Sequence, residues 1–141
     1  ILELSGAAVE LGQLNSEALA EELIRSHVFV SSSFIENSPN AVCEAQLLGM
    51  PVVSTYTGGV PSLIQEGQTG LFFPPGDSPS LAARLREVFY NDDLAVRLGE
   101  QARKAAVQRH DPDVIIKKVM AIYEETQKRG EERNIRSFHS F

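Results

Sequence analysis

Residues 28–59 of the chain read VFVSSSFIENSPNAVCEAQLLGMPVVSTYTGG, and this stretch decides the fold class. Its two apolar runs, VFV and PVVST, have the β-branched character of short strands that are buried on both faces. Between them, Ser38 predicts an N-cap, Pro39 the first helical position, and Gly49 the C-cap of a helix. A strand, a helix and a second strand in this order predict a parallel sheet with right-handed crossovers.

The start of the predicted helix is a candidate anion site. A helix that begins at Pro39 leaves the backbone N–H groups of Asn40, Ala41 and Val42 without intrahelical partners, and the helix dipole favours an anion there. The side chain of Glu44, further along the helix, leans back toward this start. A carboxylate in that place can accept hydrogen bonds from a vicinal diol, as acidic residues do with ribose in dinucleotide-binding folds.

Three more residues border the candidate site. Glu36 lies in the loop before the helix and would face the next part of a ligand. Gly58 and Gly59 follow the second strand, where glycine permits the backbone to approach a ligand closely. Each feature also has a purely structural interpretation: the glutamates can be solvent-facing charges, and the diglycine can be a tight turn without a ligand.

Composition limits the classes of function. The chain has 141 residues and a net charge of −6, which argues against a nucleic-acid partner, because phosphates require a basic surface. No apolar run approaches the roughly 18 residues that suggest a membrane span. The single cysteine, Cys43, cannot form an internal disulfide and is expected to be a small core residue.

The rest of the chain continues the alternation of strands and helices and predicts an α/β protein: a partial Rossmann-like, doubly wound parallel sheet with flanking helices. Asn15 or Ser16 should cap the first helix, and Ser78, followed by Pro79, should cap a later one. The helix after Ser78 should bury a stripe made of Leu81, Leu85, Val88 and Phe89. The other predicted elements are strands at 7–11 and 71–73, a helix after residues 91–93 and a last helix that begins at Asp111 and Pro112 and has Ile115, Val119, Ile122 and Thr126 along one face.

The chain is expected to be one domain, residues 1–128, followed by a charged and flexible tail, residues 129–141. It begins with Ile1 and has no signal peptide, and its sheet has fewer strands than a doubly wound domain normally has. We therefore expect it to be a piece of a longer protein whose sheet starts upstream.

No Ser-His-Asp set, zinc-ligand cluster, Walker loop or GxGxxG motif is present, so no metal site is expected. Instead, ENSPNAVCE at residues 36–44 resembles the E-x7-E motif of the retaining GT-B glycosyltransferases of the family 4 type, also called glycosyl transferases group 1. The neighbouring segments VFVSSS, EAQLLGMPVV, GGVP and GLFFPPGD resemble the segments around that motif, in the same order. The resemblance covers roughly residues 9–126 and identifies the C-terminal, donor-binding half of a GT-B fold.

The resemblance implies a role for each candidate residue. Glu44 would bind the ribose of a nucleotide-diphosphate sugar, the donor substrate, and no cofactor or metal would be needed. The backbone at the helix start (Asn40, Ala41 and Val42) would hold the diphosphate. Glu36 would contact the donor sugar as the catalytic residue, and Gly58 and Gly59 would add backbone contacts. The sugar would be transferred with retention, in glycan or polysaccharide synthesis.

The chain departs from the family pattern in three respects. Ser62 stands where many members have an acidic residue. The family's basic pair, which neutralises the diphosphate, lies upstream of the motif. Arg25 is the only lysine or arginine ahead of the motif in this chain, but it lies at a predicted helix end and is not assigned that role. The domain that binds the sugar or lipid-linked acceptor is missing, so the chain alone is expected to be inactive. The expected location is cytoplasmic, with attachment to the inner membrane face left open. A non-catalytic nucleotide-sugar-binding module, or an epimerase or hydrolase of the same architecture, remains an alternative.

Overall fold

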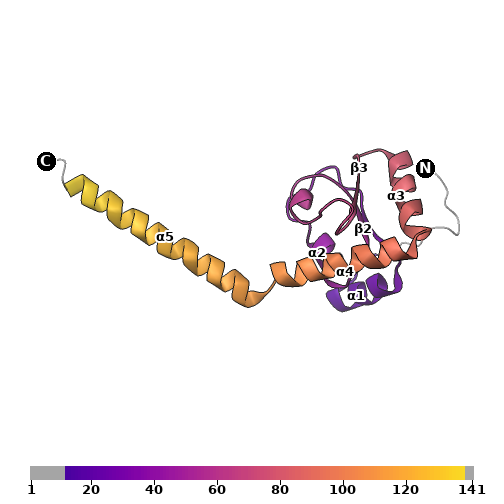
Figure 1. Cartoon of the computed structure of the whole chain (residues 1–141), viewed down its shortest axis with the longest axis horizontal. Helices are drawn as coiled ribbons and strands as arrows, with labels where there is room; N and C mark the ends of the chain where they lie inside the picture. Colours follow the sequence, from indigo (N-terminus) through magenta and orange to yellow (C-terminus); the bar gives the residue numbers. More distant parts are fainter. Residues whose placement is uncertain (1–11, 139–141) are drawn as a thin grey trace.

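The computed structural model describes residues 12–138, so the strand predicted at 7–11 lies outside the described residues. The body contains a small sheet with helices around it, and the last helix projects away from this body (Figure 1). In chain order, the elements are α1 (Ser16–Arg25), β1 (Phe29–Ser31), α2 (Asn40–Leu47), β2 (Val52–Thr55), the 3-10 helix η1 (Val60–Ser62), β3 (Leu71–Phe73), α3 (Ser78–Phe89), α4 (Asp92–Arg109) and α5 (Pro112–Phe138).

The sheet has three described strands in the order β1-β2-β3, and both strand pairs are parallel. Val53 of β2 lies opposite Val30 of β1 and Leu71 of β3. The prediction of a parallel sheet in an α/β protein is therefore confirmed. Because the strands are parallel, the loops that follow them leave the sheet at one common edge, where open α/β sheets bind ligands.

Helices cover both faces of this sheet. On one face, Val52 packs with Leu23 of α1 and Val42 of α2. On the other face, its neighbour Val53 packs in a second core cluster with Val88 of α3 and Leu98 of α4. Consecutive residues of a strand point to opposite faces, and this alternation explains why the central strand β2 is buried along its whole length.

Two predicted helix caps are wrong, whereas the cap of α1 is confirmed. Asn15 caps α1, with its side chain accepting a hydrogen bond from the Ala18 N–H. Ser38 does not cap α2. Its carbonyl accepts a hydrogen bond from the Asn40 N–H, and because of this turn the helix begins one residue later than predicted, with Pro39 as its N-cap. Ser78 does not cap α3, because the carboxylate of Asp77 occupies that role.

The final helix is longer than predicted. We expected helical structure to end near residue 128, but α5 continues to Phe138. Glutamate, lysine and arginine are good helix formers, and Glu125 forms an i,i+4 ion pair with Arg129, so the charged segment supports a helix without an apolar stripe. The apolar face predicted for this helix is exposed, with Ile122 at 63%. No helix within the described part of the chain is long and apolar enough to span a membrane.

One further buried position was predicted wrongly. Phe89 was expected in the buried stripe of α3, but its side chain is 53% exposed, whereas its neighbour Val88 is buried. Phe89 is the last residue of α3, and its ring lies against that of His27, with the ring centroids 5.9 Å apart. The stripe therefore ends one residue earlier than the helical periodicity indicates.

Candidate functional site

The loop that carries Glu36 is attached to the end of β2. The hydroxyl of Thr55, a fully buried residue, donates a hydrogen bond of 2.7 Å to the carbonyl oxygen of Ser33. The hydroxyl of Thr57 donates to the same oxygen at 3.1 Å, and the two hydroxyls lie 3.2 Å apart. These bonds fix the chain just beyond β1, at the edge of the sheet where the strands end.

Gly58 and Gly59 pack against the same loop. A Cβ atom on Gly58 would lie 1.4 Å from the main-chain oxygen of Glu36, and one on Gly59 would lie 2.6 Å from that of Asn37. Gly58 also has a φ of +54°, which side chains with a Cβ rarely adopt. The close backbone approach that glycine permits is thus made to the Glu36 loop. Whether these residues also contact a ligand stays a prediction.

The amide groups at the start of α2 are less available than predicted. The Asn40 N–H donates to the Ser38 carbonyl at 2.9 Å, and the Val42 N–H donates to the Pro39 carbonyl at 3.1 Å. Within residues 12–138, the Ala41 N–H has no hydrogen-bond partner. The expectation of three free amides is therefore wrong, because the turn at residues 38–40 uses the Asn40 N–H and the turn at residues 39–42 uses the Val42 N–H. The side chain of Val42 is buried in the core.

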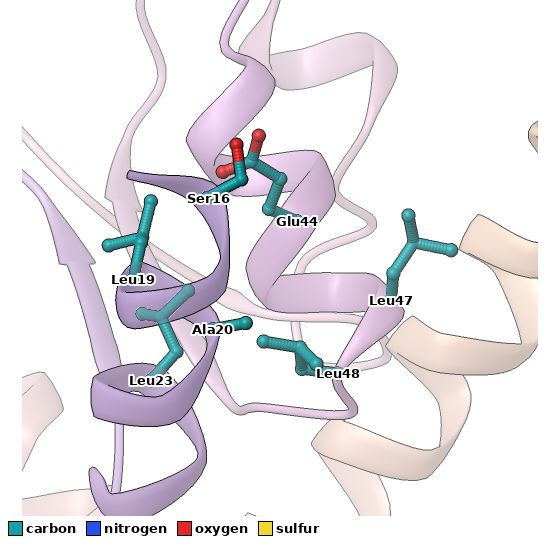
Figure 2. Close-up of a pocket in the computed structure, with 7 residues that line it drawn as sticks. All are labelled: Ser16, Leu19, Ala20, Leu23, Glu44, Leu47 and Leu48. Carbon is teal, nitrogen blue, oxygen red and sulfur yellow. The ribbon is translucent and has the colours of Figure 1, made fainter. Parts of the chain in front are cut away.

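Glu44 lies at a groove between α1 and α2. Figure 2 shows its carboxylate beside the hydroxyl of Ser16, the first residue of α1. The groove has a volume of about 230 Å³, and below these two polar groups it is lined by apolar side chains: Leu19, Ala20, Leu23, Leu47 and Leu48. No local pattern in the sequence predicts this position for Ser16, because only the packing of the two helices brings it next to Glu44.

Glu36 lies in the loop between β1 and α2, and its side chain is half-buried. Its Oε1 accepts a hydrogen bond of 3.0 Å from the Asn37 N–H. This local bond leaves the second carboxylate oxygen without a partner among the described residues. Glu36 can therefore accept a hydrogen bond from a ligand while its own loop holds it in place.

A second cavity, of about 210 Å³, lies beside the start of α2. It brings together Asn40 and Gly59, two of the predicted site residues, and it is also lined by Ser62. The Ser62 hydroxyl donates to the Gly59 carbonyl at 2.6 Å. The structure thus divides the predicted residues between two places, with Glu44 at the α1–α2 groove and Asn40 and Gly59 at this cavity.

In the described part of the chain, no three His, Cys, Asp or Glu side chains lie close enough together to hold a metal ion.

The sequence model of the family described as glycosyl transferases group 1 matches residues 2–105, which is most of the chain. The chain belongs to this family. Its match includes both glutamates of the site and the diglycine, so the arrangement described above is part of the group 1 domain.

Two curated relatives share about a third of the matched residues. Sulfoquinovosyl transferase SQD2 of Arabidopsis thaliana is 35% identical over 100 residues, which are 69% of this chain and 20% of that protein. D-inositol 3-phosphate glycosyltransferase of Streptomyces coelicolor is 32% identical over 93 residues, which are 66% of this chain and 20% of that protein. The chain thus spans about a fifth of the length of these relatives.

Two solved structures share the fold. Sucrose-phosphate synthase of Thermosynechococcus elongatus matches with a TM-score of 0.75 and 25% identity over 84% of this chain and 30% of that one. HepE of Anabaena, solved in complex with UDP, matches with a TM-score of 0.70 and 24% identity over 74% of this chain and 29% of that one. The three-stranded sheet and its helices are therefore part of a GT-B glycosyltransferase fold.

Proposed function

We propose that this chain is the donor-binding part of a retaining glycosyltransferase. The enzyme would transfer a sugar from a nucleotide-diphosphate sugar to an acceptor without a metal ion. The proposal is supported by membership of the group 1 family and by the two motif glutamates, Glu36 in the loop before α2 and Glu44 on α2 at the groove. The acceptor would be bound by parts of the enzyme outside this chain, which spans a fifth of SQD2.

The observation that carries the proposal is that Ser16, the first residue of α1, and Glu44 of α2 line the same end of the groove (Figure 2). A carboxylate accepts two hydrogen bonds from a cis-diol, and an adjacent hydroxyl can donate or accept a third. The two helix N-termini also favour the negative charge of a diphosphate nearby. This end of the groove therefore suits the ribose of a nucleoside diphosphate.

The donor's remaining groups would extend from Glu44 toward the Glu36 loop. The Ala41 N–H, the unpartnered amide at the start of α2, would donate to the diphosphate. The free carboxylate oxygen of Glu36 would accept a hydrogen bond from a hydroxyl of the sugar. As the glycosidic bond breaks, negative charge grows on the departing diphosphate, and donors fixed around it would stabilise that charge.

The proposal is tested by titrating the chain with UDP, GDP and ADP, followed by NMR. We expect one of these nucleotides to shift the amide resonances around α2. Glu44→Ala should then weaken its binding about 10- to 100-fold, which corresponds to the loss of hydrogen bonds to a charged group. Glu100→Ala, which removes an exposed carboxylate from α4, is the matched control and should leave affinity unchanged. Equal affinity in the wild type and Glu44→Ala contradicts the proposal.

A further inference from the structure

One buried polar side chain of α2 has no part in the site described so far. Gln46 is 0% exposed and lies two residues beyond Glu44. Residues of an α-helix are about 100° apart around its axis, so Gln46 points away from the face that carries Glu44. Its amide nitrogen donates to the Leu63 carbonyl at 3.0 Å, and its amide oxygen accepts from Arg109 at 2.6 Å.

Arg109 connects this amide to two other segments. It is the last residue of α4, and its guanidinium also contacts the Leu63 carbonyl at 3.5 Å. Leu63 directly follows η1, which begins next to the diglycine. We call Gln46, Arg109 and the Leu63 carbonyl the polar clamp. The clamp thus joins α2, the segment after the diglycine and the end of α4.

The clamp is suited to fixing how α2 is rotated about its own axis. The helix has eight residues, and its other buried side chains, Val42 and Ala45, are small and apolar. Apolar contacts are not directional, so small side chains define a rotation weakly. Hydrogen bonds are directional, and a buried amide that loses a partner is costly, which favours the single orientation that satisfies both ends of Gln46.

We propose that Gln46 and Arg109 are positioning residues for the nucleotide site. They hold the buried face of α2 in one orientation. This orientation sets the direction of the Glu44 side chain on the opposite, exposed face of the helix, and so aligns its carboxylate with the ribose diol. This inference rests on the proposed function, because it assumes that Glu44 binds a diol. It assigns to the clamp a role in recognition that is separate from its contribution to stability.

The test measures recognition of the diol directly. The chain is titrated with UDP, GDP and ADP and with the 2′,3′-dideoxy analogue of each, and NMR gives the affinities. The readout is the ratio of the affinity for the ribonucleotide to the affinity for its dideoxy analogue. The wild type should prefer the ribonucleotide, and Glu44→Ala should lose this preference. Gln46→Leu, similar in size and apolar, should lower the ratio about fivefold or more, since small displacements of a site group are costly.

Arg109→Met gives a second, independent test at a half-buried position. It should lower the ratio as Gln46→Leu does, and Arg109→Lys, which keeps a charged donor, should restore part of it. Lys104→Met removes a charge from the exposed side of the same helix and should leave the ratio unchanged. The amide spectrum of each variant reports whether it is folded; if Gln46→Leu is unfolded, the Arg109 variants decide.

The two ideas fail differently. A wild type that binds none of the nucleotides, or does not prefer the ribonucleotide, contradicts the proposed function. The proposed role of the clamp alone is overturned if the wild type prefers the ribonucleotide and the folded Gln46→Leu and Arg109→Met variants show the same affinity ratio as the wild type.

Discussion

A methyl group on the α-carbon of Gly58 would lie 1.4 Å from the main-chain oxygen of Glu36. The two residues are far apart in sequence, yet their backbones are in contact at the edge of the sheet where β1 and β2 end. The bonds from Thr55 and Thr57 to Ser33 hold the same loop from its other end. The catalytic candidate Glu36 is therefore placed by the segment that follows β2.

Gly58→Ala should destabilise the protein by more than about 2 kcal/mol, because the new methyl group adds a clash to the strain of a positive φ. The loop of Glu36 would have to move away. The control is Gly67→Ala, at a φ of +72° with no atom within 4 Å of the added Cβ. It should show only the strain, about 1–2 kcal/mol. The free energy of unfolding in urea measures both, and equal losses would refute the contact.

Thr55→Val should cost about 1–3 kcal/mol, because it removes a buried donor from the Ser33 carbonyl while keeping the shape of the side chain. Thr55→Ser keeps the hydroxyl and should lose less, mainly the transfer free energy of one methyl group. Urea denaturation compares the variants. A Thr55→Ser loss as large as that of Thr55→Val would show that the methyl group, and not the hydrogen bond, matters.

Glu36→Gln should separate recognition of the sugar from recognition of the nucleotide. The variant keeps an oxygen that can accept from the Asn37 N–H but removes the charge. We expect the affinity for a nucleotide-sugar to fall about tenfold, the loss of a charge-assisted hydrogen bond, while the affinity for its nucleoside diphosphate stays within about twofold.

Calorimetric titration with UDP-glucose against UDP, and with GDP-mannose against GDP, checks this separation. Glu17→Gln, at an exposed position of α1, serves as the control and should change neither affinity. An equal loss for sugar-bearing and sugar-free nucleotides would place Glu36 at the diphosphate or the nucleoside instead.

The cap of α3 should make stability depend on pH in acid. Hydrogen bonds from the hydroxyl and N–H of Ser80 hold the pKa of Asp77 below its ordinary value of 3.8. The folded pKa is lower than the unfolded pKa, so the stabilisation is present above the unfolded pKa and is lost as the pH falls through the folded pKa. The melting temperature should therefore decrease below about pH 4.

Asp77→Asn should reduce this acid dependence, because asparagine caps a helix without ionising. Melting curves between pH 2 and pH 7 give the comparison. Asp93→Asn, in the first turn of α4, removes one exposed carboxylate elsewhere and is the control. If the Asp77 and Asp93 variants follow the same curve, the cap of α3 does not account for the acid sensitivity.

The sequence predicted the α/β class and the described strands because their signals are local. Runs of β-branched residues in β2 and of leucine and phenylalanine in β3, bounded by proline and glycine, define these strands without help from the rest of the chain. Caps depend on finer geometry. Ser38 and Ser78 each stand next to another residue that ends up in the cap position, and composition alone does not decide between neighbours.

The arrangement of the site was only partly predictable. Glu36, Glu44 and the diglycine were recognised by their order, but the contact between Gly58 and the Glu36 backbone joins distant parts of the sequence and has no local signal. Ser16 was expected only as a possible helix cap, and packing of α1 on α2 places it beside Glu44. The polar clamp was missed for the same reason, since Gln46 and Arg109 lie 63 residues apart.

The Glu36 loop is held through main-chain oxygens, those of Ser33, Glu36 and Asn37. Every amino acid supplies such an oxygen, so the anchoring does not depend on which side chains the loop carries. Ile35, the residue before Glu36, is 92% exposed and takes no part in it. Residues such as Ile35 can therefore be exchanged during evolution or by design, while the position of the glutamate is inherited unchanged.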